Sequence, residues 1–366
     1  MKKIAIIATA IVAALAACTR SEVSKPEAQA ISFAPNALST KALILPDGNA
    51  GTTVAFPESE SFNVFAFADL DGTGTEYTTD YEHPLMNDVN ISKQGGDWKA
   101  TTGTYLWPAT GTVDFYAYYP SSITAEFISD AEPKGLSLTG ISLGTVVGSQ
   151  IDPLIGSTLS QAAASKPTVS LVLKHITSQI AVTAYDATTT ASLQGKISIK
   201  SVVFKNMNTT GDYREGTTVG KGEWSNVNTS ANFTSFSGSE VLSTDESYLS
   251  AGSFAAAIDN SAAFVVIPVD IINDATTGQA IDVTYSIASY SINGFDYPAT
   301  PNQTVSIPLY NRVSANKFQN GKRYVFHIGI SLDGANNEIM FSPVVDGWDT
   351  EDIDGITIDA INADLL

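Results

Sequence analysis

Hydrophobic and polar residues alternate along most of the chain with the period of two that is typical of β-strands. The alternation is clearest over residues 62–67 (FNVFAF) and in the aromatic run 113–120 (VDFYAYYP). Residues 169–184 predict two strands or one long bent strand, and a loop rich in Thr, Ser, Asn and Gly is expected over 206–232. Further strands are expected over residues 196–204, 262–269, 280–292, 304–309 and 323–332.

Only residues 157–165 and 245–257 leave room for a short helix, so the prediction is an all-β protein. Many short strands with a turn about every ten residues are typical of β-sandwiches. A chain of 366 residues exceeds what one core usually organises. We therefore expect two β-sandwich domains in tandem, an N-terminal one over 42–165 and a C-terminal one over 166–352.

The N-terminal end has the pattern of an export signal. Lys2 and Lys3 precede an apolar run from Ile4 to Ala17 that is too short for a permanent membrane span. The run ends in Leu-Ala-Ala-Cys18, which resembles the lipobox of bacterial lipoproteins. Residues 1–18 are thus predicted to be a lipoprotein signal peptide, with Cys18 as the lipidated residue. Because Cys18 is the only cysteine, no disulfide is expected.

Residues 19–41 predict a polar tether followed by a first strand. Ile31 and Phe33 are spaced to share one face of that strand. Lys41, followed by Ala42, lies in a stretch that should be exposed and open to proteolysis. The alternative for Lys41 is an ordinary solvated loop lysine.

The C-terminal residues 353–366 end the chain in another alternating stretch. Its apolar residues change phase once, as in a strand with a bulge. The alternative is an ordinary last strand of its own domain. The first set that shares a face is Ile356, Ile358 and Ala360, and the second is Ile361, Ala363 and Leu365.

The charge of the chain argues against binding to nucleic acid. The formal net charge is −19. Removal of the first 41 residues, with five basic and two acidic groups, leaves 14 basic against 36 acidic groups, or −22. Such a body is repelled by phosphate backbones and by anionic lipid.

The sequence offers little for catalysis or for binding a metal ion. His83, His175 and His327 lie far apart on different expected elements, so we expect no metal site, no catalytic residues and no cofactor. His175 is expected to be a hydrogen-bonded structural residue. The aromatic residues of 105–119 are expected to pack in the core rather than to form a platform for a ligand.

The assembled pattern resembles the fimbrillin family, the pilus subunits of Bacteroidales. The matching pieces, in chain order, are the lipobox at 15–18, Thr-Lys-Ala at 40–42, 62–67, 105–108 with 113–120, Leu-Val-Leu-Lys-His at 171–175, 323–328 and 344–348. The resemblance implies two β-sandwich domains of transthyretin-like topology. It also implies transport to the outer membrane as a lipoprotein and a cut by a trypsin-like protease after a basic residue, here Lys41.

A cut after Lys41 would release the first strand together with the lipid. The open sheet edge would then seek another strand, and the tail of a neighbouring subunit could fill it. Repeated head-to-tail contacts generate a filament. The expected partners are therefore identical or related subunits, in a fimbria at the cell surface. The alternatives are a fimbrial tip adhesin, a surface lipoprotein that binds glycans and, least favoured, an extracellular hydrolase.

Overall fold

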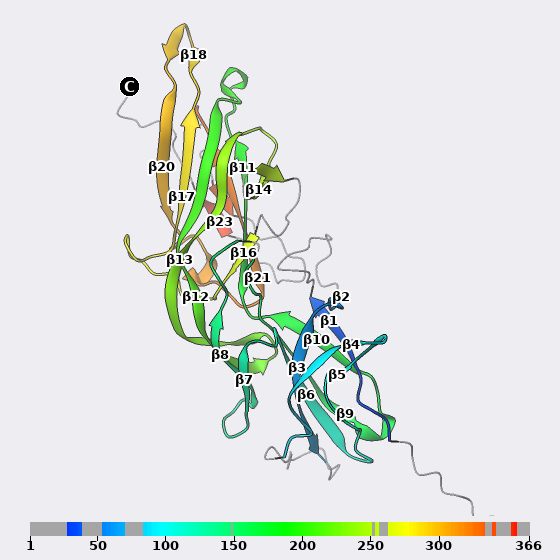
Figure 1. Ribbon diagram of the computed structural model, residues 1–366. Helices are drawn as coiled ribbons and strands as arrows, with labels where there is room; N and C mark the ends of the chain where they lie inside the picture. Colours follow the sequence, from blue (N-terminus) through cyan, green and yellow to red (C-terminus); the bar gives the residue numbers. More distant parts are fainter. Residues whose placement is uncertain are drawn as a thin grey trace, which may run out of the picture.

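The computed structural model describes residues 28–38, 53–69, 83–147, 149–250, 253–255, 263–333, 339–341 and 353–356. The molecule is elongated, with one sheet at its lower end and two others above it (Figure 1). No α-helix occurs in these residues, and their only helical turns are of the 3₁₀ type, at Ala163–Ser165, Ala191–Leu193 and Ser314–Asn316. The prediction of an all-β protein is confirmed.

The first sheet has eight strands in the order β10-β9-β6-β3-β4-β5-β1-β2. A further pairing of β1 with β10 closes it into a ring. Its strands are β1 (Phe33–Leu38), β2 (Thr53–Ala55), β3 (Ser61–Asp69), β4 (Met86–Gln94), β5 (Asp97–Ala100), β6 (Thr112–Tyr119), β9 (Leu154–Ala162) and β10 (Val169–His175).

The central strands of the first sheet are buried on both faces. One face of β3 and β6 packs into the interior of the ring, through residues such as Val64 and Phe115. The other face packs against the rest of the molecule, through Phe65 and Tyr116. Burial of both faces explains why the sequences of these strands are almost continuously apolar.

The second and third sheets lie above the first and enclose the largest core between them. The second sheet consists of β11 (Ser178–Asp186), β14 (Ser247–Ser250), β15 (Ser253–Ala255), β16 (Ala263–Val266), β21 (Lys322–Ile330), β22 (Ile339–Phe341) and β23 (Ile353–Ile356). The third sheet consists of β7 (Thr124–Ile128), β8 (Gly135–Ser142), β12 (Ile197–Thr218), β13 (Lys221–Val241), β17 (Ala280–Ile287) and β20 (Thr300–Pro308). A separate hairpin, β18 (Tyr290–Ile292) and β19 (Phe295–Tyr297), forms the upper end.

The loop expected over 206–232 is wrong. These residues continue the β12–β13 hairpin, whose strands are 22 and 21 residues long. Met207, Thr209, Gly211, Tyr213 and Glu215 alternate as buried positions with less buried neighbours. A strand pattern is therefore present, but small and polar residues at the inward positions conceal it.

The strands of the three sheets do not separate at residue 165, where the boundary between two domains was expected. Strand β10 follows residue 165 but belongs to the first sheet, whereas β7 and β8 precede that residue and pair into the third sheet. The helices allowed over 157–165 and 245–257 are also wrong, because the first stretch belongs to β9 and a 3₁₀ turn, and the described residues of the second include β14 and β15.

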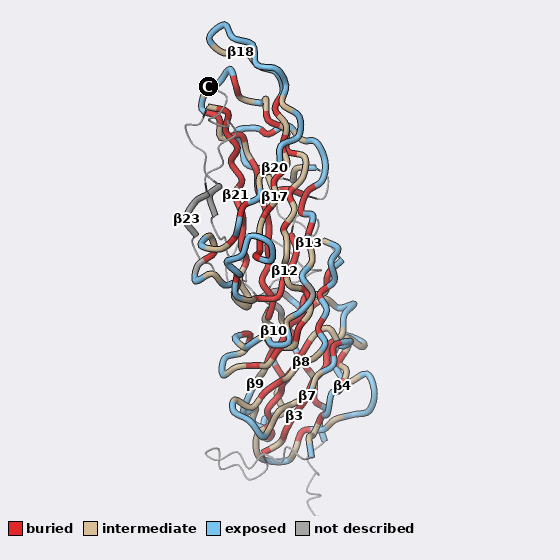
Figure 2. The backbone as a smooth tube through the Cα atoms, turned by 90° about the vertical axis from the view of Figure 1, so that its left-hand side faces the viewer, coloured by how far each residue is buried: buried red, intermediate tan, exposed pale blue. Residues whose placement is uncertain are grey.

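A hydrophobic cluster joins the lower and upper parts of the molecule. It brings Phe67 and Tyr118 of the first sheet together with Leu138 of β8, Val265 of β16 and Val325 of β21. Figure 2 shows buried residues continuing from one part into the other. Burial of apolar side chains across the junction stabilises one arrangement of the sheets.

Candidate functional site

Strand β1 fills a seam in the first sheet. It pairs in parallel with β10, from Phe33 opposite Val169 to Ala37 opposite Leu173. On its other side it meets β5 at the single pair of Phe33 with Trp98. Just before the strand, the Ile31 amide donates to the Tyr105 carbonyl at 2.8 Å. The segment is therefore held by backbone hydrogen bonds on both sides.

The inward face of this segment enters the core of the ring. Ile31 and Phe33 are 4% and 3% exposed, and Pro35 is buried as well. The ring of Phe33 makes edge-to-face contacts with Phe62, at 6.1 Å between centroids, and with Phe115, at 5.7 Å. The prediction that Ile31 and Phe33 share one face is confirmed.

The expected processing residues lie just beyond this segment. Strand β1 ends at Leu38, three residues before Lys41 in the sequence. Cys18, Lys41 and Ala42 fall outside the described residues, so their roles stay predictions. Five residues of the predicted donor strand, Ile358, Ala360, Ile361, Ala363 and Leu365, also fall outside them.

Ile356 is the sixth donor residue and ends strand β23. Its backbone pairs with Ile339 of β22, so β23 continues the second sheet of its own chain. Strand β22 is antiparallel to β21, which is parallel to β11. Strand β23 therefore runs in the same direction as β11, away from the first sheet (Figure 1).

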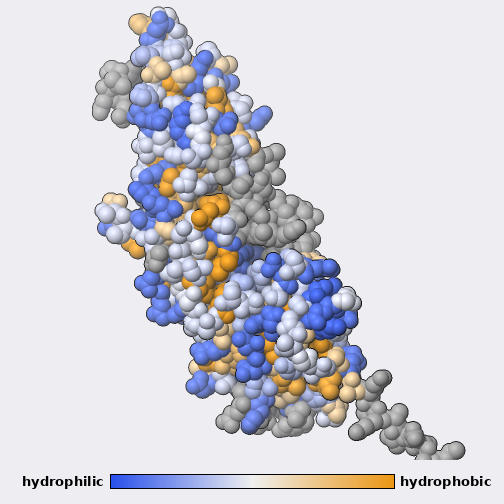
Figure 3. Space-filling view, viewed as in Figure 1, coloured by the Kyte–Doolittle hydropathy of each residue, from blue (hydrophilic) through white to orange (hydrophobic). Residues whose placement is uncertain are grey.

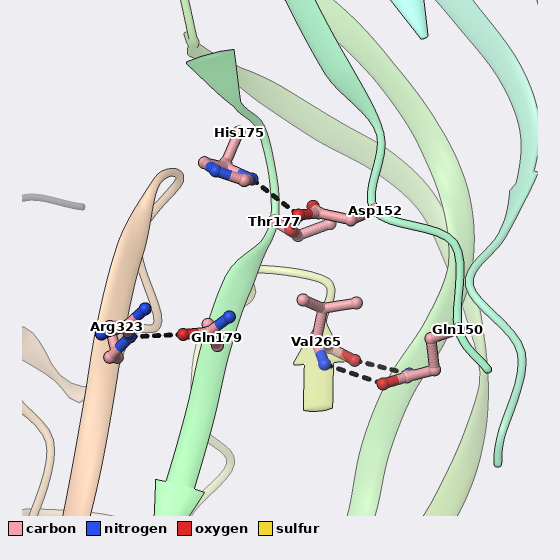
Figure 4. A network of polar contacts seen from close by, with 7 residues as sticks. All are labelled: Gln150, Asp152, His175, Thr177, Gln179, Val265 and Arg323. Carbon is pink, nitrogen blue, oxygen red and sulfur yellow. Dashed lines mark hydrogen bonds and ion pairs between the residues drawn. The ribbon is translucent and has the colours of Figure 1, made fainter. Parts of the chain in front are cut away.

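A buried polar network lies where the chain passes from β10 of the first sheet to β11 of the second (Figure 4). His175 Nδ1 lies 2.6 Å from Asp152 Oδ2, and Thr177 Oγ1 donates to Asp152 Oδ1 at 2.8 Å. All three residues are buried. The prediction of a structural, hydrogen-bonded His175 is confirmed. Nothing in the sequence indicated that Asp152 would be its partner.

Two side-chain amides extend this network into the second sheet. Gln150 donates to the Val265 carbonyl and accepts from the Val265 amide, both at 2.8 Å, as a neighbouring strand would. Gln179 of β11 accepts a hydrogen bond from Nε of the buried Arg323 of β21. Because buried polar groups are costly when they lose a partner, these contacts fix the junction.

A polar recess of about 650 Å³ lies at the tip of the β12–β13 hairpin, lined in part by Arg214, Glu215 and Lys221. Burial raises the pKa of the Glu215 carboxyl, against the hydrogen bond from the Leu136 amide and the charge of Arg214, which lower it. The Arg214 guanidinium donates to the carbonyls of Pro133 and Leu136. The recess is thus a region of internally paired groups.

The histidines do not form a catalytic arrangement. His327 Nδ1 contacts both Glu246 and Thr183, so the carboxylate and the hydroxyl share one ring nitrogen. A relay of the serine-protease kind needs them on opposite nitrogens. Within the described ranges, no group of three His, Cys, Asp or Glu side chains could hold a metal ion, and no helix is long and apolar enough to cross a membrane.

Most of the large aromatic side chains pack in the interior. Trp98, Trp107 and Tyr116 are 6%, 5% and 7% exposed, which confirms the expectation for the aromatic block around residues 105–119. On the face shown in Figure 3, hydrophobic residues reach the surface in small groups rather than as one broad platform. Phe295, which lies in no motif of the sequence, is 70% exposed.

The family model described as fimbrillin-like matches residues 40–348. The chain belongs to the fimbrillin-like family. The match begins just after β1, so the strand that closes the ring lies outside it. A comparison with curated proteins found no match.

The solved structures that match this chain include two from Bacteroides species. A fimbrial protein from Bacteroides vulgatus has a TM-score of 0.50 at 16% identity, with 89% of this chain and 99% of that chain covered. A protein from Bacteroides uniformis, described as a candidate for cell adhesion, has a TM-score of 0.46 at 17% identity, with 87% and 98% covered. The first of these shows a shared fold for the fimbrillin-like chain.

Membership of the family supports a fimbrial or adhesive role in an appendage at the cell surface, together with related subunits. A fimbrillin-like family suggests a structural role. The resemblance seen in the sequence is therefore confirmed at the level of the family and of this general role.

Proposed function

We propose that this fimbrillin-like chain is a shaft subunit of a fimbria, activated by proteolysis and polymerised by donor-strand exchange. The precursor is exported, lipidated at Cys18 and carried to the outer membrane. A trypsin-like protease cuts between Lys41 and Ala42, and the tail within residues 353–366 of a neighbouring subunit, beyond its β23, then replaces the segment that leaves. The chain has no catalytic function of its own.

The observation that carries this proposal is the position of β1. The segment 28–38 is an integral part of the first sheet, yet it ends three residues before Lys41 in the sequence. A single cut there separates the strand covalently from the sheet that it completes. An ordinary N-terminal extension on the surface would not be buried at Ile31 and Phe33.

Loss of this segment leaves an edge that needs a new occupant. The backbone of β10 would lose its partner from Val169 to Leu173, and the rings of Phe62 and Phe115 would lose Phe33. Exposed edges of this kind bind additional strands, with alternate side chains that enter pockets. Beyond β23, the alternation of Ile361, Ala363 and Leu365 is suited to the inward positions held by Ile31, Phe33 and Pro35.

We further propose that the chain comprises two tandem β-sandwich domains of transthyretin-like topology. The closed first sheet supports an N-terminal unit, and the large core between the second and third sheets supports a C-terminal unit. Because β10 pairs with β1 and β9, the boundary is best taken within the Ile176–Thr177 connection rather than at residue 166.

The test is the N-terminal sequence of the surface-exposed mature protein. Ala42 as the first residue, together with ladders that resist detergent, is the expected result. Deletion of residues 355–366 should abolish the ladders and leave a folded monomer. A mature protein that still begins at lipidated Cys18 would refute the shaft role and favour an anchored adhesin or a glycan-binding lipoprotein.

A further inference from the structure

The β18–β19 hairpin carries its large apolar side chains on one face. Tyr290 pairs with Tyr297, and their rings stack at 4.9 Å between centroids with 10° between planes. Ile292 pairs with Phe295 across the same face, while Ser291 and Asp296 bond to each other on the opposite face. Asn293 and Gly294 make the turn with positive φ values of 53° and 82°, which suits a tight hairpin.

Half of this face is packed and half of it is open. Tyr290 and Ile292 pack against the large core. Phe295 and Tyr297 are 70% and 39% exposed, and Phe295 is the most exposed large hydrophobic residue in the described part of the chain. The hairpin lies at the upper end of the molecule, opposite the first sheet (Figures 1 and 2). Exposed aromatic residues clustered at one point are typical of surfaces that become buried in an assembly.

The direction of the C-terminal strand indicates what meets this hairpin. Strand β23 runs away from the first sheet, toward the hairpin end, and the sequence continues for ten residues beyond Ile356. Ten extended residues span at most about 33 Å. A subunit that receives this tail must therefore lie close to the hairpin end of the donor.

The direction of β1 indicates at which end of the first sheet the tail would enter the receiving subunit. Strand β1 is parallel to β10, and its first residues lie beside Tyr105 and Trp107. A donor strand that keeps this direction enters at the same end. There Leu106 is already 41% exposed, and residues 29–31 cover the backbone on either side of it in the precursor.

We propose that the β18–β19 hairpin of one subunit docks on the Tyr105–Trp107 segment of the next copy once residues 28–38 have left. This inference rests on the proposed head-to-tail polymer and adds a second contact to the donated strand. The partner of the hairpin is a second copy of this chain rather than a sugar. Sugar sites combine an aromatic face with polar groups that converge on the ligand, whereas the only polar side-chain atoms among the four paired residues of this face are the hydroxyls of Tyr290 and Tyr297.

The first test replaces Phe295 with serine in the full chain, expressed in cells that assemble the fimbria. We expect ladders to form at least about fivefold more slowly, as for loss of an interface residue of moderate importance. The matched control is Ser291→Ala on the polar face of the same hairpin, which should assemble at the wild-type rate. Because Phe295 is mostly exposed, the melting temperature of the monomer should stay unchanged.

The second test uses the absence of cysteine from the processed chain. Residues 42–366 contain none, so Phe295→Cys combined with Leu106→Cys should give disulfide-linked ladders that survive boiling and disappear on reduction. The control pair is Ile272→Cys with Leu106→Cys. Ile272 is also exposed but precedes β17, at the end of that strand away from the hairpin.

The outcomes separate this inference from the proposed function. Wild-type assembly rates for Phe295→Ser, or no more disulfide from position 295 than from position 272, would overturn the docking while the polymer itself persists. Absence of any ladder from the wild-type chain would instead overturn the proposed function. A disulfide from position 295 to a different protein would also overturn the choice of a second copy.

Discussion

The packing of Phe33 predicts a large loss of stability in the precursor when that side chain is removed. Phe33 is 3% exposed and contacts two other rings edge to face. Burial of such a side chain contributes about 1.5–3 kcal/mol, and each aromatic pair adds about 0.5–1.5 kcal/mol. We therefore expect Phe33→Ala to lower the free energy of unfolding by about 3–5 kcal/mol, the range usual for loss of a buried phenylalanine.

The assay is urea unfolding of a soluble precursor that spans residues 19–366, followed by tryptophan fluorescence. Trp98 and Trp107 lie in the same cluster as Phe33 and report on the first sheet. Ala34→Ser is the control, because Ala34 is exposed on the opposite face of β1. A loss below about 1 kcal/mol for Phe33→Ala would show that β1 adds little to the first sheet, and would remove the physical basis for strand replacement.

Three further changes test other parts of the structure. Asp152→Ala leaves two buried donors without their acceptor and should lower the free energy of unfolding by about 3 kcal/mol in urea, whereas the exposed Asp270 should tolerate alanine at almost no cost. The pKa of Glu215 in the folded chain is raised above its ordinary value of 4.5, so between these two pKa values the folded chain binds more protons than the unfolded chain. The free energy of unfolding should therefore fall as the pH rises from 4.5 to the raised pKa. Urea midpoints of Glu215→Gln should lack this part of the pH dependence, and an unchanged slope would contradict the assignment. Gly222→Ala would bring its Cβ to 2.1 Å from the Arg214 carbonyl, and the melting temperature should fall by several degrees, consistent with about 1–3 kcal/mol for overpacking.

Strands β3 and β6 of the first sheet were predictable because their apolar side chains are large. Residues 62–67 fall within β3 and residues 113–119 within β6. The strands at 169–175 and 178–186 match the first of the two alternatives for residues 169–184, a pair of strands. The strand expected over 196–204 is the first part of β12, but the rest of the β12–β13 hairpin was missed for the opposite reason. Thr209 and Gly211 occupy inward positions of β12 but carry little hydrophobic signal.

The candidate site was only partly predictable from local pattern. The spacing of Ile31 and Phe33 indicates a strand face, but nothing near them specifies pairing with residues 169–173. Asp152 and His175 meet across 23 residues that form β9 and β10, without any motif. Such contacts depend on the arrangement of whole sheets, which a period of two along the chain does not encode.

The length of β12 has a mechanical consequence. Its first part pairs with β17 in the upper part of the molecule, and its later residues pair with β8, which packs on the first sheet. One uninterrupted strand therefore crosses the junction along the long axis (Figure 1). Tension along that axis loads its ladder hydrogen bonds in shear, so many must break together, whereas peeling would break them singly. Single-molecule stretching should accordingly give one high-force event for the upper part and the junction together rather than an early separation of the two.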